Sequence, residues 1–432
     1  SGQANSFPNL LAQQFALVGG GAFTQPSYAD DISGFGGLKL YGNIISGTRR
    51  VIDASVGGVE YIGGTASVSG PVDIEVSNLQ ATAYNNMGVP GAKSFHLLAP
   101  GYGNIAGVAL GQSNPYFVRH ATSPSATVLG DAMSKNPTFF TNWIGANDVL
   151  AYATNGGAQA NGVTPAVDQT GNMDVTTYGS NDITDPSAFA FTYNLIINGG
   201  THPSLGPITG LTSNGAKGVV ATIPSVTSIP YFTTVPYNAI PDAAIASNPQ
   251  APLLVQLYGF LSVATNGRIS PLNLTDGVNN AILINDADLP SLSTQITTFA
   301  NGSGNQLLID NANALGAIYG RARLATSNDL VVLTASGILS PPNNVDPNLP
   351  APFNLNGITS PLANKWVLTS NEKAKVATAT AAYNSAIVSI AASKNLAVAD
   401  MNAIMNQLVS GLQIETGQIY TAYYFGQNPL KL

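Results

Sequence analysis

An aromatic and apolar run that stops at a polar turn, FFTNWIGANDVL over 139–150, constrains the fold of this chain most. Apolar character continues to Ile144, Gly145-Ala146-Asn147-Asp148 interrupts it, and Val149 starts a new element. Such a run predicts a strand buried on both faces. Open α/β sheets bind ligands at the carboxyl ends of their strands, so the turn would border a crevice. An asparagine there can donate its amide to a developing oxyanion, as acyl transfer requires.

The order of the predicted elements indicates an α/β fold. We expect loops and short hairpins over 22–80. Strands are predicted at 82–88, 139–144, 218–223 and 396–400. Helices are predicted over 8–16, 114–120, 126–134, 185–196 and, after the capping box Thr369-Ser370-Asn371-Glu372, to about 394, with a further helix over 401–409. This alternation predicts βαβ units and a parallel sheet with helices on both faces.

The predicted core is interrupted by a large insertion. We assign 1–238 and 361–432 to the core and 239–360 to the insertion. The insertion is expected to hold a helix near 253–263, a strand pair within 306–334 and a long loop at SPPNNVDPNLPAPFNLNG (340–357).

The amino-acid composition limits which partners the protein can bind and which catalytic groups it can use. Only 15 Lys and Arg stand against 22 Asp and Glu, without a basic cluster, which disfavours nucleic acid as a partner. The chain has no cysteine, which excludes a thiolate nucleophile and a Cys-ligated metal. Asp310, Asp329 and Asp400 lack metal-ligand spacing, so we expect neither a metal nor a cofactor. No apolar run is long enough to span a bilayer. Because Ser1 starts without Met or a leader, we expect a processed, trimmed or partial chain.

Two turns resemble blocks of a known enzyme family. NNMGVPGA (85–92) and WIGANDVL (143–150) are similar to the second and third blocks of the SGNH (GDSL-type) hydrolases. The resemblance implies that Gly91 supplies a backbone N–H and Asn147 a side-chain amide to an oxyanion, with Gly145 and Asp148 in support. It also implies a flavodoxin-like three-layer sandwich. Read without the family, Pro-Gly makes a plain tight turn, and Asp148 could cap the helix that follows it.

Longer segments resemble one branch of this family. They are SGQANSFPNLLAQQFALVGGGAFTQP, GAKGVVATIPSVTSIPYFTTVPYNAI and LTSNEKAKVATATAAYNSAI, which are similar to exported SGNH proteins of the Bacteroidota, often lipoproteins. This likeness implies an acyl-ester or lipid substrate and a location in the periplasm or at the cell surface, on an outer-membrane lipid anchor. It also implies an outer-membrane lipid-transport barrel as a partner.

Two catalytic blocks of the family are absent from this sequence. The chain has no Gly-Asp/Asn-Ser-Leu block ahead of the helix at 8–16, and no Asp-x-x-His anywhere; it stops at 428–432, about where that last block would begin. We therefore expect two oxyanion donors without a nucleophile or a base. His96 (near Ser94), His120 and His202 are expected to be ordinary loop histidines. Trp143 and Trp366 are expected to be core aromatics.

Three functions stay open at this point. The first is an SGNH-type ester hydrolase whose nucleophile and base blocks lie outside this chain. The second is a non-catalytic SGNH-like binding or accessory subunit of a cell-surface complex, docking through the insertion. The third is an unrelated extracellular structural protein or adhesin, which an almost helix-free fold would favour.

Overall fold

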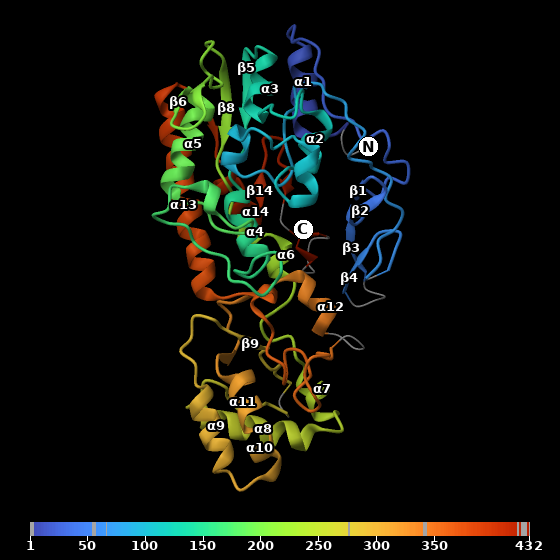
Figure 1. Ribbon diagram of the computed structural model, residues 1–432, viewed down its shortest axis with the longest axis vertical. Helices are drawn as coiled ribbons and strands as arrows, with labels where there is room; N and C mark the ends of the chain where they lie inside the picture. The colour runs from blue at the N-terminus through green and yellow to red at the C-terminus, as the bar shows by residue number, and fades with distance from the viewer. Residues whose placement is uncertain are drawn as a thin grey trace.

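The computed structural model describes residues 4–53, 58–65, 67–274, 277–339, 344–420, 423–424 and 430–431 (Figure 1). The fold is mixed α/β, and its centre is a three-stranded parallel sheet in the order β13-β8-β5. The strands are β5 (Phe139–Asn142), β8 (Lys217–Ala221) and β13 (Ala397–Ala399). Thr141 pairs with Val219, which in turn pairs with Ala397. The prediction of a parallel sheet from strands that alternate with helices is therefore confirmed.

The predicted strand at 82–88 is wrong. Its backbone donates hydrogen bonds to separate segments, from Thr82 N–H to the His120 carbonyl and from Asn86 N–H to the Thr24 carbonyl. A β-ladder needs successive hydrogen bonds to one neighbouring strand, whereas these bonds go to two different segments, so 82–88 forms no strand. The described sheet accordingly has three strands where four were expected.

The two faces of the sheet are covered unequally. Phe140 and Val220 are buried in the main core, where helices α5 (Pro186–Asn198) and α13 (Ser370–Ser393) pack against each other. On the opposite face Phe139 is 40% exposed and Thr141 is also exposed. The expectation that 139–144 is buried on both faces is therefore wrong. An apolar run alone cannot show whether a second layer covers its other side.

Most predicted helices are found close to their expected limits. The helices that flank the sheet or its loops are α1 (Phe7–Ala16), α2 (Pro115–His120), α3 (Val128–Ser134), α4 (Asn147–Thr154), α6 (Pro230–Thr233) and α14 (Met401–Ser410). Short 3-10 turns are η1 (Ser94–Leu98), η2 (Ile105–Leu110), η3 (Val175–Thr177), η4 (Val226–Ser228), η5 (Leu333–Ala335) and η6 (Asn364–Trp366). This helical content counts against the adhesin hypothesis.

Short antiparallel hairpins form separate two-stranded sheets outside the central sheet. The hairpins predicted within 22–80 are confirmed as β1 (Leu38–Leu40) with β2 (Asn43–Ser46) and β3 (Arg50–Asp53) with β4 (Gly58–Tyr61). Further pairs are β6 (Gly200–His202) with β7 (Gly206–Ile208), β14 (Leu412–Gln413) with β15 (Ile419–Tyr420), and β16 (Tyr423–Tyr424) with β17 (Leu430–Lys431).

Residues 239–360 contain a second buried cluster, which includes Leu261, Ile296, Leu315 and Tyr319. It is built by helices α8 (Ala251–Ala264), α9 (Ser293–Asn301), α10 (Gln306–Asp310) and α11 (Ala312–Tyr319), drawn mostly in yellow and orange in Figure 1. Helices α7 (Asp242–Ala246) and α12 (Ser336–Leu339) lie in the same range but pack against the main core. The helix expected near 253–263 is confirmed as α8. The limits 239 and 360 of the insertion stay a prediction.

The strand pair predicted within 306–334 is wrong in its first half, where α10 and α11 lie. Leu308, Ala312, Leu315 and Tyr319 are buried at helical spacing, so a helix buries them together and a strand would not. Two strands do form in the second half of the segment, β10 (Ala322–Leu324) and β11 (Leu330–Val331), but they do not pair with each other. β10 pairs with β9 (Leu283–Asn285) and β11 with β12 (Val367–Leu368), and both partners lie outside 306–334. Of the loop expected at 340–357, residues 340–343 lie outside the described residues.

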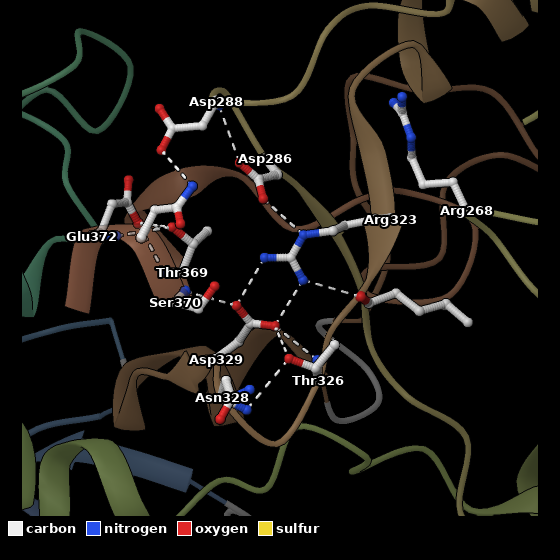
Figure 2. Close-up of polar contacts among 12 residues, drawn as sticks. Arg268, Asp286, Asp288, Arg323, Thr326, Asn328, Asp329, Thr369, Ser370 and Glu372 are labelled. Carbon is white, nitrogen blue, oxygen red and sulfur yellow. Dashed lines mark hydrogen bonds and ion pairs between the residues drawn. The ribbon is translucent and has the colours of Figure 1, made fainter. Parts of the chain in front are cut away.

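A buried ionic network connects β10 to the start of α13 (Figure 2). The Arg323 guanidinium donates to Asp286 at 2.7 Å and to both carboxylate oxygens of Asp329 at 2.7 and 2.8 Å. Asp329 is fully buried and also accepts the Ser370 backbone N–H, at 3.0 Å. One arginine therefore balances two carboxylates and ties the strand to the first turn of the helix.

We expect Arg323→Ala to lower the free energy of unfolding by about 3–5 kcal/mol, because Asp329 and Asp286 would stay buried without a counter-charge. The matched control is Arg321→Ala, since Arg321 is exposed and its guanidinium donates to the Ala287 carbonyl, away from the buried carboxylates. The control should cost under about 1 kcal/mol in the same urea titration. Equal losses for the two variants would contradict the assignment.

The capping box at the start of α13 holds a carboxyl group with a raised pKa. Glu372 accepts hydrogen bonds from the Thr369 N–H at 2.8 Å and from its hydroxyl at 2.9 Å, which confirms the capping box. Burial raises the pKa of Glu372 to about 7, although the Thr369 hydrogen bonds act in the opposite direction. In the folded protein Glu372 therefore holds its proton up to near-neutral pH.

This pKa predicts a pH-dependent stability. Between the unfolded pKa of 4.5 and the folded pKa of about 7 the native state binds more protons, so the free energy of unfolding falls as pH rises. Glu372→Gln keeps an acceptor for Thr369 but does not titrate. Relative to the unsubstituted protein, it should gain roughly 3 kcal/mol between pH 4.5 and pH 8. Urea titrations across that range measure this difference, with exposed Glu415→Gln as the control; parallel curves for Glu372→Gln and the parent would refute it.

Candidate functional site

The candidate site is built on the turn between β5 and α4. Gly145 has a φ of +122°, and a Cβ added there would lie 2.5 Å from Ile223 and 2.9 Å from Phe189. Both the backbone conformation and the space therefore require glycine. The glycine brings the turn close to the core, and α4 starts at Asn147 directly behind it.

The structure brings Asn147 and Gly91 to the same place. The Asn147 amide nitrogen donates to the carbonyl of Ala92 at 2.9 Å, and Ala92 is the residue after Gly91. An amide carries two N–H groups, so one stays available to a ligand. Gly91 is exposed with a φ of +78°, and its N–H has no hydrogen-bond partner among the described residues. Two free donors thus lie on neighbouring segments.

Asp148 fastens these two segments together. Its side chain is fully buried and accepts the Ser94 backbone N–H at 2.9 Å and the Ser94 hydroxyl at 2.8 Å. Its carboxylate does not cap α4, so that alternative is wrong. Burial raises the pKa of the Asp148 carboxyl, and the two Ser94 hydrogen bonds oppose this rise. The carboxyl group thus joins the turn after β5 to the segment that carries Gly91.

A buried lysine lies beside this carboxyl group. The Lys93 side chain is only 4% exposed, and its ammonium donates to the Asp182 backbone carbonyl at 2.7 Å. Burial lowers the pKa of Lys93, while the charges of Asp148 and Asp182 raise it. Sequence reasoning missed Lys93 as a site residue. The only available signal was its position directly after the 85–92 block.

The hydroxyl and imidazole groups near the site are already engaged. The Ser94 hydroxyl is fully buried and donates to Asp148, which makes it a poor nucleophile. His96 lies in η1, where its Nδ1 accepts the Lys93 N–H and its ring stacks on Tyr102 at 4.5 Å. Burial and the nearby Lys93 charge lower the pKa of His96 to about 4. It is therefore neutral at pH 7.

The other two histidines lie in ordered elements. His120 ends α2 and is buried, and burial lowers its pKa to about 4. His202 lies in β6, and its Nδ1 accepts the backbone N–H groups of Ser204 and Leu205. The expectation of an ordinary loop histidine is thus wrong for His120, whereas His96 is half-buried and hydrogen-bonded in its 3-10 turn. Within the described part of the chain, no hydrogen bond joins a histidine to a serine hydroxyl.

A groove of about 840 Å³ runs beside β5 and includes Asn147 in its lining. Trp143 is 46% exposed in it and meets Phe7 of α1 edge-on at 6.0 Å. The expectation that Trp143 is a core aromatic is therefore wrong, whereas Trp366 does pack, partly buried, against the main core. Gly91 lies outside the groove lining.

Neither a metal site nor a membrane-spanning helix is found among the residues that the structure describes. No group of three or more His, Asp or Glu side chains is placed to hold a metal ion. None of the described helices is long and apolar enough to cross a bilayer.

Comparisons with known protein families, with characterised proteins and with solved structures find no match for this chain.

The geometry around Gly145 predicts a large cost for a single methyl group. Gly145→Ala should lower the free energy of unfolding by about 3 kcal/mol or more, because it adds both a strained φ and a clash with Ile223 and Phe189. The matched control is Gly215→Ala, which also has positive φ, +81°, but open space around the added Cβ. It should cost about 1–2 kcal/mol. Equal costs in chemical denaturation would show that the close approach at Gly145 does not matter.

Proposed function

We propose that this protein is an SGNH-type ester hydrolase acting on acyl esters. The observation that carries the proposal is the hydrogen bond from Asn147 to the Ala92 carbonyl, which sets a side-chain amide beside the free N–H of Gly91. An oxyanion hole requires hydrogen-bond donors, and these two lie on adjacent segments. The resemblance of the same two turns to the SGNH blocks assigns them this role.

In the proposed ester hydrolysis this chain supplies the oxyanion donors, and the missing blocks supply the nucleophile and the base. A serine hydroxyl attacks the ester carbonyl while a histidine takes its proton, and the carbonyl oxygen becomes an oxyanion. Gly91 N–H and the Asn147 amide donate to that oxyanion. Its collapse expels the alcohol and leaves an acyl-serine, which water hydrolyses to the acid. In this proposal the serine and the histidine come from blocks of the full-length protein outside this chain.

The donors are preorganised by contacts that do not involve a substrate. The Ala92 carbonyl fixes the Asn147 amide, and the Asp148–Ser94 pair fixes the distance between the two segments. Donors that need no rearrangement in the transition state are worth more than mobile ones. Gly145 contributes by letting the turn sit against Phe189.

The finer fold and the setting belong to the same proposal. We infer a flavodoxin-like three-layer sandwich, supported by α5 and α13 on one side of the sheet and by α1, which meets β5 through Phe15 and Phe139 at 4.9 Å, on the other. From the resemblance we further infer an exported, lipid-anchored protein of the periplasm or cell surface. Its substrates would be acyl lipids or acylated polysaccharides, and its partner an outer-membrane lipid-transport barrel.

A non-catalytic accessory subunit is the second candidate. The observation that favours it is the engagement of Ser94 with Asp148, which leaves no serine–histidine pair among the described residues. In that case the Gly91–Asn147 pair would bind an anionic or carbonyl-bearing ligand without turnover.

Substitution of Asn147 separates the two candidates. In the natural full-length protein, Asn147→Ala should lower kcat for ester hydrolysis by roughly 10²–10³, because one oxyanion donor is lost. Asn155→Ala is the matched control, since Asn155 lies at the other end of α4 and its side-chain amide donates to the Ala151 carbonyl. Both variants should keep the parental circular dichroism. Unchanged kcat in a folded Asn147→Ala variant would refute the donor role, and no turnover in the parent would favour the accessory subunit.

A further inference from the structure

Lys93 has a buried ammonium group where three segments of the site meet. Its Nζ donates to the Asp182 backbone carbonyl at 2.7 Å. The next residue along the chain, Ser94, donates twice to the Asp148 carboxyl group. The Thr184 N–H, two residues beyond Asp182, donates to the Asp148 backbone carbonyl at 3.1 Å. The lysine therefore lies between the segment of Ser94, the start of α4 and the loop of Asp182.

The carboxylate of Asp182 is hydrogen-bonded without the help of this lysine. It accepts four bonds of 2.6–2.8 Å from neutral donors, which are the side-chain amides of Gln159 and Gln169 and the backbone N–H groups of Val167 and Gly179. Burial raises the pKa of the Asp182 carboxyl group, but these hydrogen bonds outweigh burial and hold the pKa below its usual value. The Asp182 carboxylate therefore does not depend on Lys93 for its stability.

The carboxyl group of Asp148 has a greater need of a positive charge. It is fully buried, and burial raises its pKa, whereas the Ser94 hydrogen bonds and the charge of Lys93 lower it. The effect is mutual. Burial lowers the pKa of Lys93, and of the two carboxyl groups that oppose this, Asp148 acts more strongly than Asp182. Because a buried charge is stable only when it is paired, the two groups stabilise each other's charged forms.

The other titratable groups around Asp148 cannot supply this positive charge. They come from η1, from the loop before α5 and from α13, and they are His96, Asp168, Tyr178, Asp182, Asp185 and Tyr383. Burial and the charge of Lys93 lower the pKa of His96 to about 4, so this ring is neutral at pH 7. The tyrosines carry no positive charge, and the aspartates add negative charge. In this group of neighbours the counter-charge for Asp148 comes from Lys93.

The protonation state of Asp148 determines how firmly it holds Ser94. A carboxylate accepts with both oxygens, which is what the N–H and the hydroxyl of Ser94 require. A protonated carboxyl group must donate its own O–H, so one of the two bonds is lost or reversed. Hydrogen bonds to a charged acceptor are also roughly twice as strong as those to a neutral one. Neutral Asp148 would therefore loosen the connection between the segments of Gly91 and Asn147.

We propose that Lys93 is a positioning residue of the candidate site: its buried ammonium keeps Asp148 in the carboxylate form, and the carboxylate holds the donors of Gly91 and Asn147 in place. Lys93 touches neither substrate nor oxyanion and acts through Asp148 and Ser94. The charge pairing of Lys93 with Asp148 is independent of ester hydrolysis, whereas its effect on catalysis rests on the proposed function.

Carbon-13 NMR of the aspartate carboxyl groups in the natural full-length protein tests the charge pairing, with Asp148→Asn to assign the signal. In the unsubstituted protein Asp148 should be a carboxylate at pH 7. Lys93→Gln removes the charge but keeps a donor for the Asp182 carbonyl, and it should raise the pKa of Asp148 by about 1–3 units.

The matched control is Lys394→Met, which removes one positive charge from the exposed C-terminal end of α13 and should leave the pKa of Asp148 unchanged. Lys93→Met offers the same comparison if Lys93→Gln does not fold. An unchanged pKa of Asp148 in a folded Lys93 variant would overturn the proposal. A protonated Asp148 at pH 7 in the unsubstituted protein would overturn it without any variant.

The pH profile of ester hydrolysis supplies a second readout. In Lys93→Gln, kcat should fall by roughly tenfold for each pH unit below the raised pKa of Asp148 and should approach the parental value above it. KM should stay the same, because the oxyanion donors act in the transition state. A kcat lowered by the same factor at every pH would show a merely structural role and overturn the positioning role. Absence of turnover in the unsubstituted protein would refute only the ester-hydrolase proposal, since the NMR titration does not use catalysis.

Discussion

The buried bond between Asp148 and Ser94 is the interaction on which the candidate site depends. A carboxyl group with no exposed surface is stable only if its oxygens are hydrogen-bonded, and Ser94 supplies both a backbone and a hydroxyl donor. The bond joins residues 54 positions apart. It thereby holds the Gly91 segment against the turn that carries Asn147, so the placement of both donors follows from one buried contact.

The rest of the molecule supports that contact through packing and a few buried charges. Gly145 lets the turn approach Phe189, which stacks on Tyr383 of α13 at 4.3 Å. The start of α13 is in turn tied to β10 through Ser370, Asp329 and Arg323. Arg323, one of only 15 Lys and Arg in the chain, balances the charge of the two buried carboxylates in this connection.

Local sequence patterns predicted the helices and strands better than they predicted which side chains are buried. The capping box at Thr369 and the apolar runs of β5, β8 and β13 were readable because each depends on residues near in sequence. The strand predicted at 82–88 was wrong because a strand also needs a neighbouring strand to pair with, and the local sequence does not show whether one is present. Exposure of Trp143 and the Asp148–Ser94 bond both arise from distant contacts, so no local pattern indicates them.

The most direct test of the proposed function is the intact mass of the natural protein before and after reaction with a fluorophosphonate, which labels activated serines. The proposal predicts one covalent adduct per polypeptide, at a serine outside this chain, with hydrolysis lost in step with labelling. A folded natural protein that takes up no probe would contradict serine ester hydrolysis, and the Gly91–Asn147 pair would then belong to a binding protein.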